Sequence, residues 1–251
     1  MYIHYTELTY GICGTPTHFA LEDMVARIEG GTRCQLTSSG LSACTIALLS
    51  FLKAGDHCLL PDSVYGPVRG FADGFLRRFG IQVEYYHASA PAAELEGHFK
   101  PNTRVLYIES PGSHSFELVD VAAFARLARA RGAKSVLDNT YGIHFFAPFS
   151  TGEVDVSVQA LTKYVAGHSD TLMGAICTNA DGDWELVRQT TMELGEVASP
   201  DDCWLALRGA RTLGVRLEHQ MKAGLTVAEW LEAQPEVLRV LHPALPSCPG
   251  A

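Results

Sequence analysis

Short, uninterrupted apolar runs alternate with helix-like segments along most of this 251-residue sequence. Three helix-like segments are each followed by glycine, a common helix stop: Leu41–Ala54, Val68–Phe79 and Val121–Arg131. The apolar runs predict buried strands at Cys58–Leu60, Gln82–Tyr86, Val105–Ile108, Ser135–Leu137, Val154–Val158 and Ala175–Thr178. Because buried strands joined by helices are typical of parallel sheets, we expect an α/β fold whose mostly parallel sheet is covered by helices on both faces.

The composition agrees with a folded chain of this class. Hydrophobic residues make up 47% of the sequence and aromatic residues 9%, which excludes wholesale disorder. The length could hold one large α/β domain or two small ones. After Asp201 the pattern becomes helical, first over Leu205–Leu217 and then through Trp230–Ala233.

Charge and cysteine usage exclude several classes of protein. The formal net charge of −9 argues against a nucleic-acid or anionic-membrane partner, since phosphate binding needs an excess of Lys and Arg. The sequence contains no run of 18 apolar residues and does not begin like a signal peptide. The seven cysteines form no CxxC pair and no zinc-like spacing with histidine. We therefore expect a cytoplasmic protein without a metal site.

Polar clusters follow three of the predicted strands. They begin at Glu109, at Asp138 and at the segment that leads to Thr162 and Lys163. Ligands of open α/β sheets bind beyond the carboxyl ends of the strands. The three clusters are therefore candidates for one shared site.

Lys163 and Asp138 point to a particular chemistry. A lysine just after a buried strand can form a Schiff base with an aldehyde cofactor, although a surface lysine at a strand end is the simpler alternative. A carboxylate at a strand end can pair with a pyridinium nitrogen, although Asp138 could equally be a helix cap or turn residue.

Two further segments complete this pattern. The small residues Ser38–Ser42 open a helix whose free N–H groups would hold a phosphate, or they are an ordinary helix cap. Tyr65 follows a strand in a turn and could stack on a planar cofactor or simply bury its ring. In the order phosphate turn, aromatic residue, aspartate and lysine, the four features describe a pyridoxal 5′-phosphate site.

The sequence resembles the cystathionine γ-synthase/β-lyase family of pyridoxal 5′-phosphate enzymes over nearly its whole length, and most resembles the bacterial β-lyases within it. The motifs that carry the resemblance are Ser39-Gly40-Leu41, Asp62-Ser63-Val64-Tyr65-Gly66-Pro67, Glu109-Ser110-Pro111-Gly112-Ser113, Leu137-Asp138-Asn139-Thr140 and Gln159-Ala160-Leu161-Thr162-Lys163-Tyr164-Val165-Ala166-Gly167-His168-Ser169-Asp170. It implies the large domain of the aspartate aminotransferase-type fold. It also implies α,β-elimination of L-cystathionine to L-homocysteine, pyruvate and ammonia.

The resemblance implies a role for each matching residue. Lys163 would carry the cofactor as a Schiff base and, once freed by substrate, move protons from the substrate Cα. Asp138 would hold the pyridinium nitrogen, and Tyr65 would stack on the ring and assist proton handling. The phosphate would be bound by the remaining positions: Gly40, Leu41 and Thr162, together with Tyr10 reaching over from a neighbouring subunit.

The family also implies partners and an organisation of the chain. Its members bind small sulfur-containing amino acids and form homodimers or homotetramers with shared active sites. Residues 1–15 would be a remnant of the N-terminal arm and 16–200 the cofactor-binding α/β domain. Residues 201–251 would be a helical segment that leads to a missing C-terminal domain, the usual source of the arginine that holds the substrate carboxylate.

The sequence departs from the family at one expected phosphate ligand. Ile12 occupies the place of an arginine two residues after Tyr10, and it offers no hydrogen bond. Two alternatives to β-lyase activity stay open, and Ile12 bears on the second. One is γ-replacement or γ-elimination, as in cystathionine γ-synthase or methionine γ-lyase. The other is a truncated, non-catalytic homologue that binds the cofactor.

Overall fold

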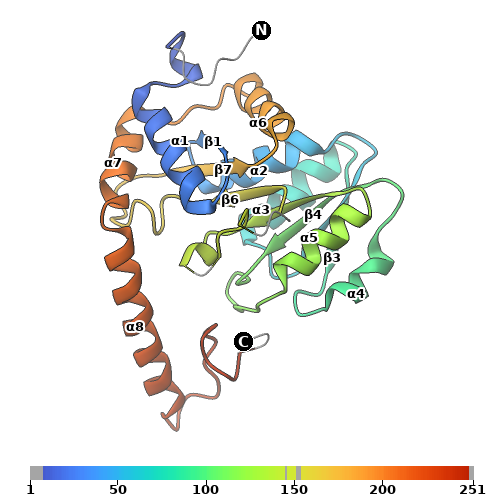
Figure 1. The fold of residues 1–251 in the computed structure, drawn as a ribbon. Helices are drawn as coiled ribbons and strands as arrows, with labels where there is room; N and C mark the ends of the chain where they lie inside the picture. Colours follow the sequence, from blue (N-terminus) through green and yellow to red (C-terminus); the bar gives the residue numbers. More distant parts are fainter. Residues whose placement is uncertain (1–7, 145, 151–153, 249–251) are drawn as a thin grey trace.

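The computed structural model describes residues 8–144, 146–150 and 154–248, and a seven-stranded sheet forms the centre of this part of the chain (Figure 1). Its strands lie in the order β1-β7-β6-β5-β4-β2-β3. Their bounds are β1 Arg33–Thr37, β2 His57–Pro61, β3 Gln82–Tyr86, β4 Thr103–Glu109, β5 Lys134–Asp138, β6 Val156–Gln159 and β7 Gly174–Thr178.

The sheet is parallel except at one strand. The pairs β2–β3, β2–β4, β4–β5 and β5–β6 are parallel, whereas β7 runs antiparallel to both β6 and β1. The expected α/β fold with a mostly parallel sheet is confirmed. Strand β1 was not expected, and the reversal of β7 is not encoded in its apolar run.

Helices cover both faces of the sheet, as the apolar strands predict (Figure 1). Alternate residues of β4 show the division: Tyr107 packs in a cluster with α2, and Leu106 packs in one with α5. Helices α3 and α6 share the α2 side, and α1 and α7 pack together over β1 and β7 on the other. The helices are α1 Pro16–Glu29, α2 Gly40–Phe51, α3 Gly66–Phe71, α4 Ala92–Leu95, α5 Val121–Ala130, α6 Asp181–Glu193, α7 Pro200–Ala210 and α8 Leu213–Glu232.

Local side-chain chemistry sets several helix ends. The Ser39 hydroxyl accepts a hydrogen bond from the Ser42 N–H at the start of α2, and Asp120 caps α5 in the same way through Ala123. Helix α1 is followed by Gly30, which has a left-handed φ of 73°. Short helical turns η1 Gly11–Cys13, η2 Ala72–Leu76, η3 Glu96–His98 and η4 Gly142–His144 complete the described elements.

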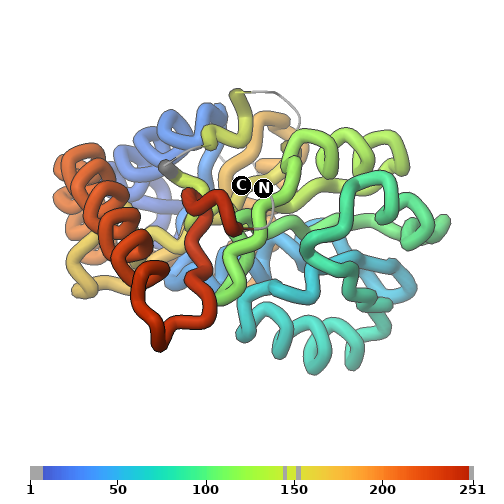
Figure 2. Tube along the Cα trace, turned by 90° about the horizontal axis from the view of Figure 1, so that it is seen from below, coloured from blue at the N-terminus to red at the C-terminus, as the bar shows by residue number. Residues whose placement is uncertain are grey.

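The C-terminal helices differ from the sequence-based expectation. The continuous helix predicted over Leu205–Leu217 is wrong: α7 ends at Ala210 and α8 starts at Leu213. The interhelix turn is held by a bond from the Thr212 N–H to the Gly209 carbonyl. Helix α8 projects beyond the sheet, and the chain after it turns back beneath the carboxyl ends of the strands (Figures 1 and 2). No helix in the described part of the chain combines the length and apolarity needed to cross a membrane.

Candidate active site

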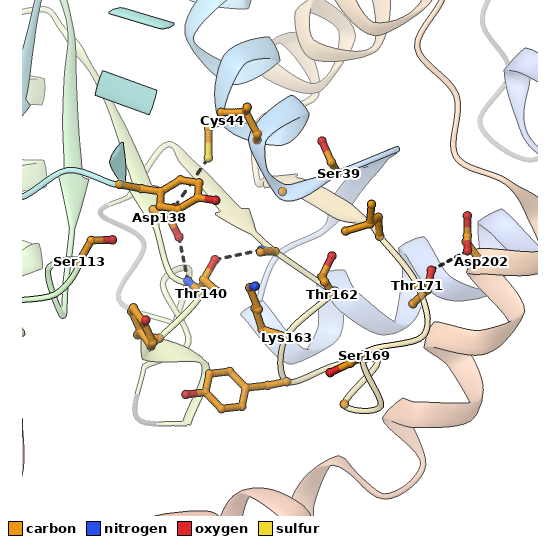
Figure 3. Close-up of a pocket in the computed structure, with 18 of the residues that line it drawn as sticks. Ser39, Cys44, Ser113, Asp138, Thr140, Thr162, Lys163, Ser169, Thr171 and Asp202 are labelled. Atoms are coloured by element: carbon orange, nitrogen blue, oxygen red, sulfur yellow. Dashed lines mark hydrogen bonds between the residues drawn. The ribbon is translucent and has the colours of Figure 1, made fainter. Parts of the chain in front are cut away.

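A cavity of about 980 Å³ lies at the carboxyl ends of the parallel strands and gathers most of the residues singled out from the sequence. Residues from β4, β5, the turn after β6 and the start of α2 line it together. Figure 3 shows the amino group of Lys163 directed into this space, between the side chains of Thr140 and Thr162. The predicted site residues that line the cavity are Lys163, Asp138, Tyr65, Gly40, Leu41 and Thr162.

Tyr10 lies apart from this group. It precedes η1, its side chain is 75% exposed, and it does not line the cavity of its own chain. Its contact with the phosphate site of a neighbouring subunit stays a prediction.

Asp138 is the last residue of β5 and lines the cavity. Its Oδ1 accepts a hydrogen bond from the Thr140 N–H at 3.0 Å. Its Oδ2 faces two donors, the Cys44 thiol at 3.7 Å and the Tyr107 hydroxyl at 3.5 Å. Burial raises the pKa of Asp138, and the hydrogen bonds from Thr140 oppose that shift by stabilising the anion.

A second buried carboxylate lies beside the first. Glu109 ends β4 directly opposite Asp138 in the parallel register, and it accepts a 2.9 Å hydrogen bond from the Tyr65 N–H. Burial, with a further contribution from the negative charge of Asp138, raises the pKa of Glu109 to about 8. Burial therefore favours the protonated forms of these two carboxyls, and a cationic ligand in the cavity would favour their ionised forms.

The opposite wall is shaped for an anion. Gly40 and Leu41 form the first turn of α2, where N–H groups have no partner within the helix. Gly40 approaches the chain so closely that an added Cβ would lie 2.6 Å from the Cβ of Ala160. Thr162 faces the same region, and its hydroxyl accepts a 2.9 Å bond from the Met173 N–H.

Several residues of the site were not assigned roles from the sequence. Glu109 was noted only as part of a polar cluster, and Cys44 and Arg216 also line the cavity. Glu29, at the end of α1, is not part of the cavity lining, and it accepts hydrogen bonds from Ser157 Oγ at 2.5 Å and Gln159 Nε2 at 2.7 Å. Only Glu109 carried a usable signal in the sequence, because it directly follows a predicted strand.

The arrangement offers a lysine amine, a buried carboxylate pair, a helix N-terminus and aromatic side chains, but no metal centre. Across the described ranges, His, Cys, Asp and Glu side chains nowhere gather in threes as metal ligands.

Comparison with known proteins decides between the families that such a site could belong to. A family model described as "Cys/Met metabolism PLP-dependent enzyme" matches residues 3–251. The chain belongs to this family.

The relatives and solved structures are consistent with membership of the Cys/Met metabolism family. The chain is 46% identical to a putative cystathionine beta-lyase of Rhizobium johnstonii and 44% identical to a cystathionine beta-lyase of Bordetella avium, each over 96% of this chain. It spans 61% and 60% of the length of these two relatives. The crystal structure of a cystathionine gamma-lyase from Lactobacillus plantarum complexed with L-serine superposes with a TM-score of 0.92 at 27% identity, over 99% of this chain and 67% of that one.

The residues present fit the pyridoxal 5′-phosphate that the family uses. A protonated pyridine nitrogen would favour the ionised form of Asp138, whose pKa is raised by burial, and would lower the cost of keeping a carboxylate in this cavity. A phosphate would satisfy the first-turn N–H groups of α2 at Gly40 and Leu41. Lys163 opens into the same cavity, where its amine can reach an aldehyde.

Proposed function

We propose that this chain is the cofactor-binding part of a carbon–sulfur lyase that eliminates L-homocysteine from L-cystathionine and leaves pyruvate and ammonia. The observation that carries the proposal is the meeting of Lys163, Asp138 and Tyr65 in one cavity at the carboxyl ends of the strands. The substrate is supported by relatives named cystathionine beta-lyase, which are 46% and 44% identical to this chain.

The cofactor and the protein divide the chemistry between them. Bound pyridoxal 5′-phosphate would supply an aldehyde carbon that reacts with the lysine or substrate amino group, and a ring that withdraws electrons from the substrate Cα. In our proposal Asp138 keeps the ring nitrogen protonated, and the α2 N-terminus at Gly40 and Leu41 holds the phosphate together with the Thr162 hydroxyl.

Lys163 is proposed to bind the aldehyde carbon and then to act as the base of the elimination. Once the substrate amino group has displaced it from that carbon, the freed amine takes the proton from the substrate Cα, the Cβ–S bond breaks, and the sulfur leaves with the electron pair as the homocysteine thiolate. Tyr65 is proposed to stack on the ring and to help return a proton to the leaving sulfur. Hydrolysis of the remaining three-carbon fragment yields pyruvate and ammonia.

The proposal extends to the assembly. We propose a homodimer or homotetramer in the cytoplasm, in which Tyr10 contacts the phosphate site of the neighbouring subunit. The 75% exposure of Tyr10 on its own chain leaves its side chain accessible for such a contact. Chemical cross-linking and cell fractionation test the assembly and the location.

Product analysis tests the reaction. Purified protein is incubated with pyridoxal 5′-phosphate and L-cystathionine, and Lys163→Ala serves as the matched control. We expect pyruvate and homocysteine from the wild type and neither from the variant. Formation of 2-oxobutyrate and cysteine would instead establish γ-elimination, and bound cofactor without any turnover would favour a non-catalytic homologue.

A further inference from the structure

The backbone around Lys163 is irregular and needs outside support. The Lys163 turn, residues 160–167, follows β6 and contains no regular helix. It is closed by bonds from the Lys163 N–H to the Ala160 carbonyl at 3.0 Å and from the Gly167 N–H to the Lys163 carbonyl at 2.9 Å. The carbonyl groups of Tyr164 and Val165 need partners from elsewhere in the chain, because backbone acceptors inside a protein are rarely left unpaired.

Arg216 of α8 supplies those partners. Its Nη1 donates to the Tyr164 carbonyl at 2.8 Å, and its Nη2 donates to the Val165 carbonyl at 3.2 Å. Both acceptors immediately follow Lys163 in the sequence. The guanidinium therefore holds the backbone that carries the reactive amine.

The same guanidinium is anchored on its other side to the turn between α7 and α8. Its Nη2 also donates to the Gly209 carbonyl at 2.9 Å, and its Nε donates to the Thr212 hydroxyl at 3.0 Å. A guanidinium has five N–H groups, and these contacts engage four acceptors. Although Arg216 lines the cavity, it is committed to protein oxygens and is poorly placed to bind a substrate carboxylate.

Two glycines allow this contact to form. An added Cβ at Gly167 would lie 2.1 Å from the Arg216 Nη1, and Gly167 also has a left-handed φ of 73°. An added Cβ at Gly209 would lie 2.0 Å from the Ala166 carbonyl oxygen. The backbone of the Lys163 turn thus packs directly against the backbone at the end of α7 and the turn after it. The planar guanidinium of Arg216 lies between the two segments.

We propose that Arg216 is a positioning residue that fixes the Lys163 turn so that the lysine amine can reach the cofactor aldehyde. The proposal rests on the proposed function, because it assigns Arg216 a role toward the same lysine. A lysine at position 216 could not replace the guanidinium. Its ammonium group is a single compact charge on a flexible stem, so it cannot reach all four acceptors.

The test separates attachment of the cofactor from binding of the cofactor. The first measurement is the rate at which pyridoxal 5′-phosphate attaches to Lys163. Samples are reduced with borohydride at successive times, and mass spectrometry gives the modified fraction. Pyridoxamine 5′-phosphate has the same ring and phosphate but no aldehyde, so its Kd reports the cavity alone. The full-length variants are Arg216→Lys and Arg216→Gln, and the matched control is Arg211→Gln at an exposed position of the same interhelix turn.

We expect both Arg216 variants to slow attachment by about 10- to 100-fold, as small misplacements of reacting groups do, while the Kd for pyridoxamine 5′-phosphate stays within about twofold of the wild type. Arg211→Gln should leave both quantities unchanged. Wild-type attachment rates in folded Arg216 variants would overturn the proposal, and so would an equal loss of attachment and pyridoxamine 5′-phosphate binding. A wild type that attaches no cofactor would instead contradict the proposed function itself.

Discussion

Glu29 provides a test of how the site is supported from beneath. Its carboxylate is only 1% exposed and joins the end of α1 to polar side chains next to Asp138. It accepts hydrogen bonds from Ser157, Gln159 and, at 3.2 Å, Asn139 Nδ2. We predict that Glu29→Gln removes a specific part of the dependence of folding stability on pH.

The magnitude follows from the pKa of this carboxyl. Burial raises the pKa of Glu29 from 4.5 to about 7, against the opposing effect of its hydrogen bonds. Below pH 4.5 the group is protonated in both the folded and the unfolded protein. Between 4.5 and 7 the unfolded chain loses its proton first, so the free energy of unfolding falls as the pH rises. This shift corresponds to a loss of about 3 kcal/mol, which is complete above the folded-state pKa.

In Glu29→Gln the free energy of unfolding should not fall in this way as the pH rises, but it should be lower by a constant amount at every pH. Its amide NH₂ would face the amide donors of Asn139 and Gln159, and an unpaired buried donor costs about 1–3 kcal/mol at every pH. The stability difference between wild type and variant should therefore shift by about 3 kcal/mol in favour of the variant between about pH 4.5 and pH 8.

Urea unfolding of the cofactor-free protein across this pH range measures the difference. Glu218→Gln is the control, because Glu218 is exposed on α8 and pairs only with Lys222 four residues on among the described ion pairs. The control should follow the wild-type pH profile. A constant difference between wild type and Glu29→Gln at all pH values would refute the reasoning.

Two further substitutions test other contacts. Gly40→Ala should weaken binding of pyridoxamine 5′-phosphate about tenfold or more, because the new Cβ would lie 2.6 Å from the Cβ of Ala160 and overpacking costs about 1–3 kcal/mol; an unchanged Kd would contradict this. Arg188→Met should lower the free energy of unfolding by about 3–5 kcal/mol, because Arg188 is buried against Gln35 and lies 3.8 Å from the buried Glu22. Adding Glu22→Leu should recover part of that loss in urea unfolding, and a double variant as unstable as the single one would contradict the explanation.

The sequence predicted the features that depend on local pattern. Apolar runs located most of the strands, and because parallel strands end at the same edge, the residues after them converge on one site. Asp138 and Lys163 lie more than twenty positions apart yet line one cavity for this reason. The Ser39 cap and the small residues after it likewise marked the start of α2 correctly.

The rest depends on contacts between distant segments, which leave no local signal. Arg216 contacts the Tyr164 carbonyl across 52 positions, and Glu29 contacts Ser157 across 128. Helix α1 escaped notice because acidic and basic residues interrupt its apolar stripe, including the buried Glu22. Strand direction also depends on the tertiary path, which is why the reversal of β7 was not foreseen.

The central claim is that the cavity is a pyridoxal 5′-phosphate site built on Lys163. Peptide mapping after incubation of the full chain with the cofactor and reduction with borohydride tests it most directly. The account predicts one modified peptide, with the cofactor on Lys163, and no stable modification in Lys163→Ala. Attachment to a different lysine, or none to the folded wild type, would contradict the account.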